Sequence, residues 1–175
     1  MVDVPLRAAV LEDVDALVDV VTRAYRGKAS TEGWTSEDHL LGGQRTDRTM
    51  VAAAVTDPDG IVLVAPGPDA LLGCIQVQRR DRGGAHFGMF AVEPTLQRSG
   101  LGARLLAAAE DEARERWQAR WMDLEVIAQR EALIAWYERK GYARTGETTP
   151  FPYGDERFGI PRRNDLHFVV LRRDL

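Results

Sequence analysis

The sequence predicts an α+β fold of the α/β/α sandwich type, in which helices cover a mixed, mostly antiparallel sheet that contains one splayed parallel strand pair. Residues 61–65, 71–78 and 85–92 are three consecutive strand candidates joined by short turns, a pattern typical of antiparallel neighbours. A strand, a helix and a second strand then follow one another between residues 85 and 127. A crossover of this kind joins strands that run parallel in one sheet.

The N-terminal segments predict one strand and two helices. Residues 6–10 are a plausible first strand. Over residues 14–25 apolar side chains recur every three or four positions, which predicts an amphipathic helix that ends near Gly27. A further helix is expected at residues 46–55, before an unambiguous turn at residues 57–60.

The central segments predict the parallel pair. Residues 85–92 are almost free of charge and end at a proline, so they are expected to form a mostly buried strand. Apolar residues at every fourth position predict a helix over residues 101–117. Residues 121–127 alternate apolar side chains with Asp123 and Glu125, which predicts a strand with one apolar face and one acidic face.

The C-terminal segments predict one helix and two strands. Residues 131–140 have a helical pattern, and Gly141 stands where a helix C-cap glycine is expected. Tyr142 begins another strand, and a final strand at residues 166–171 follows a loop rich in proline and glycine.

Length and composition limit the class of protein. The chain has 175 residues, 45% of them hydrophobic and 29% charged, so residues 1–175 are expected to form a single domain. The formal net charge of −4 and the low pI argue against a nucleic-acid partner. No signal peptide or membrane span is visible, which predicts a cytoplasmic protein without a membrane partner. Cys74 is the only cysteine, which fits a reducing compartment and favours core packing over a catalytic thiolate.

A glycine-rich loop lies between the central strand and its helix, with the sequence Gln97-Arg98-Ser99-Gly100-Leu101-Gly102. Such a turn gathers unpaired backbone N–H groups at the positive end of a helix, and its glycines let a ligand approach the backbone closely, which suits a diphosphate. A second interpretation is that the glycines only allow tight packing between strand and helix. P-loop and Rossmann motifs fit poorly, because the Gly-Lys-Ser/Thr sequence and the third glycine are missing.

This loop resembles the Gln/Arg-x-x-Gly-x-Gly/Ala signature of the GCN5-related N-acetyltransferase (GNAT) superfamily, and residues 135–142 resemble its aromatic-Tyr-Glu-x-x-Gly-Phe/Tyr segment. The order of elements is also similar over nearly the whole chain. The resemblance implies the acyl-CoA N-acyltransferase fold and an enzyme that transfers an acetyl or acyl group from its cosubstrate acetyl-CoA, without a metal, to a primary amine by direct attack in a ternary complex.

The resemblance also implies how acetyl-CoA is held. Backbone groups of Phe90, Ala91 and Val92 would bond the pantetheine arm, and an N–H near Phe90 would stabilise the oxyanion. The loop residues whose N–H groups would hold the diphosphate are Gln97, Arg98, Ser99, Gly100, Leu101, Gly102 and Ala103. Arg130 stands where many members have asparagine, and it could donate to the pantetheine carbonyl or to a phosphate but could not accept a hydrogen bond.

Two side chains are the candidate catalytic groups. Tyr137 occupies the family position of the general acid that protonates the departing thiolate, although it could also simply pack in the core. Glu125 is the candidate general base, because its separation from Tyr137 resembles that in bacterial enzymes that acetylate ribosomal-protein N-termini. It could instead be solvated or paired with an arginine, which leaves His86, Asp123, Glu93 or water as alternative bases.

The acceptor site is the least defined part. Trp34, Phe151 and Tyr153 could wall an apolar acceptor, and Glu37 or Asp38 could attract a cationic amine, although each could be ordinary loop packing. The sequence does not separate a peptide N-terminus, a free amino acid, a polyamine and an antibiotic, or a monomer and a homodimer. Two other functions stay open, a non-catalytic acyl-CoA-binding sensor or interaction module and a nucleotide- or phosphate-binding domain of another class.

Overall fold

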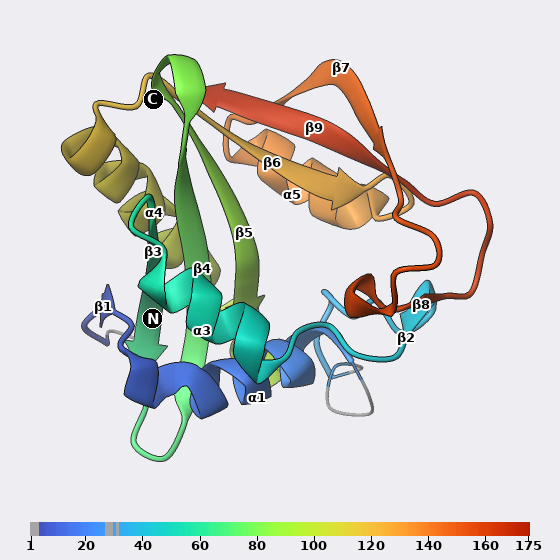
Figure 1. The fold of residues 1–175 in the computed structure, drawn as a ribbon, viewed down its shortest axis with the longest axis horizontal. Helices are drawn as coiled ribbons and strands as arrows, with labels where there is room; N and C mark the ends of the chain where they lie inside the picture. Colours follow the sequence, from blue (N-terminus) through green and yellow to red (C-terminus); the bar gives the residue numbers. More distant parts are fainter. Residues whose placement is uncertain (1–3, 27–29, 31) are drawn as a thin grey trace.

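A seven-stranded sheet forms the centre of the protein, which this computed structural model describes over residues 4–26, 30 and 32–175. Its strands are β1 (Arg7–Ala8), β3 (Gly60–Pro66), β4 (Leu71–Arg80), β5 (Gly84–Val92), β6 (Trp121–Ile127), β7 (Ala143–Pro150) and β9 (His167–Asp174). Their order in space is β1-β3-β4-β5-β6-β9-β7 (Figure 1). All neighbouring pairs are antiparallel except β5 and β6, which are parallel, so the sheet is mixed as predicted.

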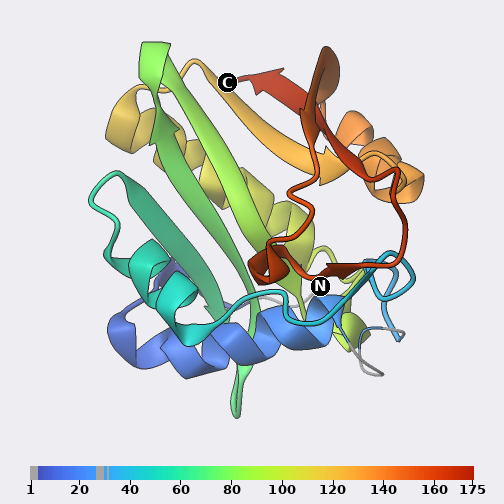
Figure 2. The ribbon, with the colours of Figure 1, turned by 45° about the vertical axis from the view of Figure 1, so that its right-hand side comes forward.

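Helices cover both faces of this sheet. The longer helices are α1 (Val14–Tyr25), α3 (Arg48–Thr56), α4 (Leu101–Trp117) and α5 (Glu131–Arg139), and the described 3₁₀ helices are η1 (Leu11–Asp13), η2 (Asp81–Gly83), η3 (Pro94–Leu96) and η4 (Glu156–Phe158). Figure 2 shows α1 and α3 on one face and α4 and α5 on the other. Each face has its own apolar core. Within the described ranges no helix combines the length and the apolar character needed to cross a membrane.

The repeat of apolar residues explains how α4 packs. The residues at every fourth position that are completely buried are Leu101, Leu105, Ala109 and Ala113. Trp117, one turn later, is only partly buried against the same core. Because α4 packs across β3, β4 and β5, its N-terminus is held next to the end of β5.

Some element ends differ from the prediction. The helix expected at residues 46–55 begins two residues later, because the side chain of Asp47 accepts a hydrogen bond from the backbone N–H of Met50 at 2.8 Å and caps the helix. The strand expected at residues 6–10 shrinks to the two residues of β1. α1 ends at Tyr25, close to the expected end at Gly27, which itself lies outside the described residues.

The C-terminal part has a topology that local patterns did not predict. β9, the last strand of the chain, lies inside the sheet between β6 and β7. β7, which comes earlier in the sequence, therefore forms the edge of the sheet. This edge strand, β7, is almost entirely exposed, and its pairing with β9 is irregular between Arg144 and Thr148. The segments β2 (Leu41–Gly42) and β8 (Ile160–Pro161) form a separate two-stranded antiparallel sheet.

The parallel pair opens toward the carboxyl ends of its strands. β5 and β6 pair only from Gly84 opposite Trp121 to His86 opposite Asp123, and beyond that point no pairing joins them. β5 also carries an irregularity against β4, where Met89 has a φ of 42° and its carbonyl accepts a hydrogen bond from the Cys74 thiol. This divergence creates the space in which the functional site lies.

Cys74 is buried, and its burial raises the pKa of its thiol to about 12.

Candidate active site

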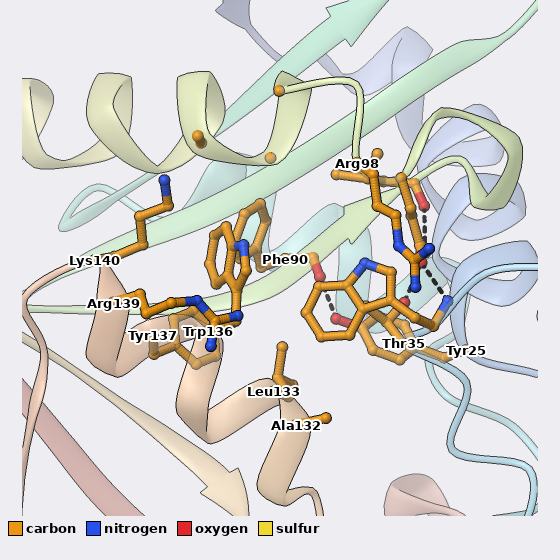
Figure 3. Close-up of a pocket in the computed structure, with 16 residues that line it drawn as sticks. Tyr25, Thr35, Phe90, Arg98, Ala132, Leu133, Trp136, Tyr137, Arg139 and Lys140 are labelled. Carbon is orange, nitrogen blue, oxygen red and sulfur yellow. Dashed lines mark hydrogen bonds between the residues drawn. The ribbon is translucent and has the colours of Figure 1, made fainter.

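Two cavities meet where β5 and β6 separate. The larger has a volume of about 510 Å³ and lies between the N-terminus of α4 and the face of α5 (Figure 3). The smaller, of about 80 Å³, lies on the other side of the divergence and is lined by residues of β5 and β6. The residues that line both are Tyr25, Phe90, Leu133 and Tyr137. A molecule in the larger cavity could therefore meet a second molecule at these four residues.

The glycine loop forms one end of the larger cavity. Gly100 has a φ of 93°, a left-handed conformation that favours glycine, and α4 begins at the next residue. Gly102 is different, because an added Cβ would lie 3.6 Å from Phe90 and from Val92, which is ordinary contact. Packing between strand and helix therefore does not require a glycine at position 102. The missing side chain instead leaves room in the cavity, next to N–H groups of the first helical turn.

Cationic side chains surround this cavity. Arg98 lies on one side of it, and Arg139 and Lys140, at the end of α5, lie on the other (Figure 3). Lys140 Nζ also stands 5.5 Å from the centre of the Trp136 ring. Together with the positive end of α4, these charges make the cavity attractive to an anion.

Gln97 has a structural role that the loop motif did not reveal. Its Oε1 accepts a hydrogen bond from the Trp34 N–H at 2.7 Å, and its Nε2 donates to Thr35 Oγ1 at 2.7 Å and to the Val92 carbonyl at 3.2 Å. Gln97 thus ties the segment after α1 to the end of β5. The tie places Trp34 on the wall of the larger cavity, 6.4 Å from the Trp136 ring, rather than in the smaller one.

Tyr137 lies at the junction of the two cavities. Its side chain is only 4% exposed, and its ring packs 5.7 Å from Phe87 and 6.1 Å from Tyr142. Burial raises the pKa of the Tyr137 phenol, so the hydroxyl keeps its proton at neutral pH. The packing interpretation and the catalytic interpretation are therefore compatible, because the ring fills the core while the residue lines both cavities.

Tyr25 is a site residue that sequence reasoning missed. It ends the apolar stripe of α1, and the sequence analysis treated it only as part of that stripe. Its hydroxyl donates a hydrogen bond to the carbonyl of Phe90 on the diverging strand, and its ring lines both cavities. Burial raises the pKa of Tyr25, so this donor stays protonated. The sequence signal that could have identified Tyr25 is its polar hydroxyl at the end of the apolar stripe of α1.

Replacing Tyr25 with phenylalanine should lower the free energy of unfolding by about 1 to 3 kcal/mol, because the partly buried carbonyl of Phe90 would lose its partner. Urea unfolding monitored by circular dichroism measures this change. Thr56→Val is the control, since its hydroxyl donates to the carbonyl of Ala52 at an exposed position, where water can replace it. Equal losses in the two variants would contradict the prediction.

Three arginines surround Glu37, which is only 5% exposed. Arg130 donates to its Oε1 at 2.7 Å, Arg26 donates to its Oε2 at 2.8 Å, and the Nε of Arg45 lies 3.7 Å from Oε2. Burial alone would raise the pKa of Glu37, but the charges of Arg130, Arg45 and Arg26 together lower it, so it is ionised. The carboxylate therefore lies on the wall of the smaller cavity and already has cationic partners of its own.

Arg130 belongs to this arginine cluster and does not point into the larger cavity. Besides its bond to Glu37 it donates to the carbonyl of Thr35 at 2.5 Å, and its guanidinium lies 5.5 Å from the centre of the Tyr25 ring. It lines the smaller cavity and not the larger one. The expected contact with a phosphate or with pantetheine would need this side chain to leave its present partners.

Among the candidate bases, Glu125 is the one that lines a cavity. It is exposed on β6 in the smaller cavity, and its Oε1 accepts a hydrogen bond from Thr149 at 2.6 Å. His86 Nδ1 and Asp123 Oδ1 are 2.8 Å apart and line neither cavity. Glu93 is paired with an arginine of α1 instead.

The two aromatic residues that were expected at the acceptor site in the C-terminal loop differ in burial. Phe151 is buried and stacks on Phe168 with ring centres 5.8 Å apart, while Tyr153 is exposed and packs on Phe151. Neither of the two lines a cavity, but Phe168 lines the smaller one. Asp38 lines neither cavity.

The sequence of this chain matches one protein-family model. A family model described as the Acetyltransferase (GNAT) family matches residues 18–142. No curated protein matches the chain.

Solved structures with the same fold cover nearly the whole chain. An N-acetyltransferase from Staphylococcus aureus Mu50 aligns with a TM-score of 0.73 and 11% identity over 99% of this chain and 98% of that one. The ribosomal-protein-S18-alanine N-acetyltransferase of Escherichia coli aligns with a TM-score of 0.67 and 20% identity over 97% and 92%. The structure of yncA from Salmonella typhimurium with its cofactor acetyl-CoA aligns with a TM-score of 0.70 and 20% identity over 99% and 95%. The predicted fold class is confirmed.

Proposed function

The chain belongs to the acetyltransferase (GNAT) family, and from this premise we propose that it transfers an acetyl or acyl group from acetyl-CoA to a primary amine of a small molecule or peptide. One observation carries the proposal. A large cavity suited to an anionic ligand and a small cavity with a carboxylate on its wall meet at Tyr137. Two substrates bound in this way would bring their reacting atoms together at the junction.

The larger cavity fits acetyl-CoA. N–H groups of the loop from Gln97 to Ala103 would bind the diphosphate, apart from those of Gln97 and Ser99, which already donate to the carbonyls of Pro94 and Leu96. The side chains of Arg98, Arg139 and Lys140 would neutralise its phosphates. Because Gly102 has no side chain, space remains for such a ligand beside its backbone. Backbone groups of β5 from Phe90 to Val92 would bond the pantetheine arm, because no pairing with β6 uses this end of the strand. When bound, acetyl-CoA supplies the activated thioester.

Three groups of the chain would perform the chemistry. A backbone N–H near Phe90 would polarise the thioester carbonyl. Glu125 would accept the proton of the acceptor amine from the wall of the smaller cavity. Tyr137 would act as the general acid, because its hydroxyl holds a proton at neutral pH and the residue lines the cavity of each substrate. Tyr25 would position the carbonyl of Phe90 and hence the strand that bonds the cofactor.

Binding and turnover can be tested separately. We expect acetyl-CoA, but not ATP or NAD, to raise the melting temperature, since only a ligand of the folded state stabilises it. We expect release of CoA thiol, detected with DTNB, to depend on one member of a panel of amines. A thermal shift without thiol release for any amine would favour a non-catalytic acyl-CoA sensor. A response to ATP or NAD alone would contradict the proposal.

Glu125→Gln should lower kcat/KM for the amine by about 10²-fold at neutral pH, the order of effect of a general base. The loss should shrink as the pH rises toward the pKa of the amine, because a neutral amine needs no base before it attacks. A pH series of initial rates measures this convergence. Thr149→Val removes only the hydroxyl that donates to Glu125 and should have a much smaller effect. Parallel pH profiles for wild type and Glu125→Gln would count against the assignment.

A further inference from the structure

The smaller cavity carries opposite charges on different walls. Glu125 of β6 contributes one carboxylate, on its own wall. Arg45, from the segment before α3, and Arg130, at the start of α5, contribute guanidinium groups beside the second carboxylate, that of Glu37. Phe168 adds an apolar wall. The volume of about 80 Å³ admits only a small group.

The arginine cluster has more positive charge than its own carboxylate can balance. Arg26, Arg45 and Arg130 share the single carboxylate of Glu37. Both oxygens of Glu37 already accept a hydrogen bond, one from Arg130 and one from Arg26. Two further nitrogens of Arg26, Nε and NH2, are buried without a hydrogen-bond partner among the described residues. A structural ion pair would be complete with Arg130 and Arg26, so Arg45 is not needed to satisfy Glu37.

Arg45 is the guanidinium available to a ligand. Its side chain is 32% exposed, and it donates no hydrogen bond to any residue in the described part of the chain. Its guanidinium carbon lies 5.0 Å from the centre of the Tyr25 ring, which holds the group beside the junction of the two cavities. It is therefore held in place by the ring and by its ion pair with Glu37, without a hydrogen bond from its N–H groups to a described residue.

We propose that the acceptor is a small amino acid, whose amine faces Glu125 and whose carboxylate is bound by Arg45 with Arg130 behind it. This inference rests on the proposed acetyl transfer and names its substrate class. A guanidinium fork matches a carboxylate, and a partly buried position strengthens the attraction. Polyamines offer no carboxylate to these guanidinium groups, and a peptide N-terminus lacks the adjacent carboxylate.

Matched acceptor pairs test the proposal. Glycine, β-alanine, 4-aminobutyrate and a set of L-amino acids are each compared with the corresponding amide by thiol release from acetyl-CoA. We expect kcat/KM for the preferred acid to exceed that for its amide by at least about 10-fold, the factor that 1.4 kcal/mol of binding gives. The amine of an amide is less basic and thus more often neutral, so this bias works against the expected result. Spermidine should be a poor acceptor.

Arg45→Gln should abolish this preference by raising KM for the acid about 10-fold while KM for the amide stays unchanged. Arg79→Gln is the matched control, because Arg79 is exposed, lies 3.7 Å from an aspartate in the same way, and lines neither cavity. A loss of charge at Arg79 should leave both KM values unchanged. Melting temperatures of both variants verify that they are folded.

Equal use of acids and amides, a preference for spermidine, or equal effects of Arg45→Gln on acid and amide would overturn the inference. If no amine is acetylated, calorimetric titration with N-acetylglycine and N-acetylglycinamide in the presence of CoA decides the matter. Preference for the acid that Arg45→Gln removes supports the inference, and no preference, or no binding of either probe, overturns it. Failure of acetyl-CoA itself to bind would instead refute the proposed function, so the two failures are distinguishable.

Discussion

Replacing Tyr137 with phenylalanine should lower kcat by about 10²- to 10³-fold, with little change in the affinity for acetyl-CoA, because it removes only a hydroxyl that we propose as proton donor. The ring contacts with Phe87, Trp136 and Tyr142 do not involve that hydroxyl and should survive. Steady-state thiol release gives kcat, and calorimetry gives the affinity. A general acid acts in the transition state, so the loss should fall on kcat rather than on binding.

Tyr142→Phe is the matched control for this experiment. The hydroxyl of Tyr142 is also buried, but it donates to Glu110 Oε1 at 3.0 Å and lines neither cavity. Its removal should lower the melting temperature and leave kcat of the folded protein unchanged. If Tyr137→Phe turned over as fast as wild type, Tyr137 would have only a packing role.

Gly102→Asp should weaken acetyl-CoA binding on the order of 10³-fold without unfolding the protein. The new carboxylate would lie at the end of the cavity where the diphosphate is expected, and two like charges a few ångströms apart repel by about 4 kcal/mol at an intermediate dielectric. The backbone tolerates a Cβ here, since the nearest atoms of Phe90 and Val92 are 3.6 Å away. An acid in the first turn of α4 also favours the helix, so stability should not fall. Calorimetry and thermal unfolding measure the two quantities.

Ala107→Asp adds the same charge to the exposed side of α4, further along the helix, and serves as the control. It should leave the affinity for acetyl-CoA unchanged. Equal affinities of Gly102→Asp and Ala107→Asp would show that the diphosphate does not lie at the glycine loop.

Local sequence patterns predicted much of the fold and the glycine loop. The period of α4 and the alternation in β6 are properties of neighbouring residues, so they are visible in the chain itself. The glycine loop was also visible, because a positive φ at Gly100 and the start of α4 both depend on local chemistry.

The rest depends on contacts between distant segments. Arg130 and Glu37 are 93 positions apart, and no local pattern reveals that they meet. Glu37 was predicted either to attract a cationic amine or to be ordinary loop packing, and no local pattern showed that the fold buries it among arginines. The position of β9 between β6 and β7 also depends on contacts between distant segments, which the repeat of apolar residues along the chain does not specify.

The irregular, exposed β7 has a consequence for association in concentrated solution. An outer strand with free backbone groups can recruit a strand from another molecule and extend the sheet into aggregates. In β7 the break in pairing between Arg144 and Thr148, the positive φ of Gly146 and the terminal Pro150 interrupt the flat row of donors and acceptors that such recruitment needs. This edge therefore resists uncontrolled sheet growth through β7.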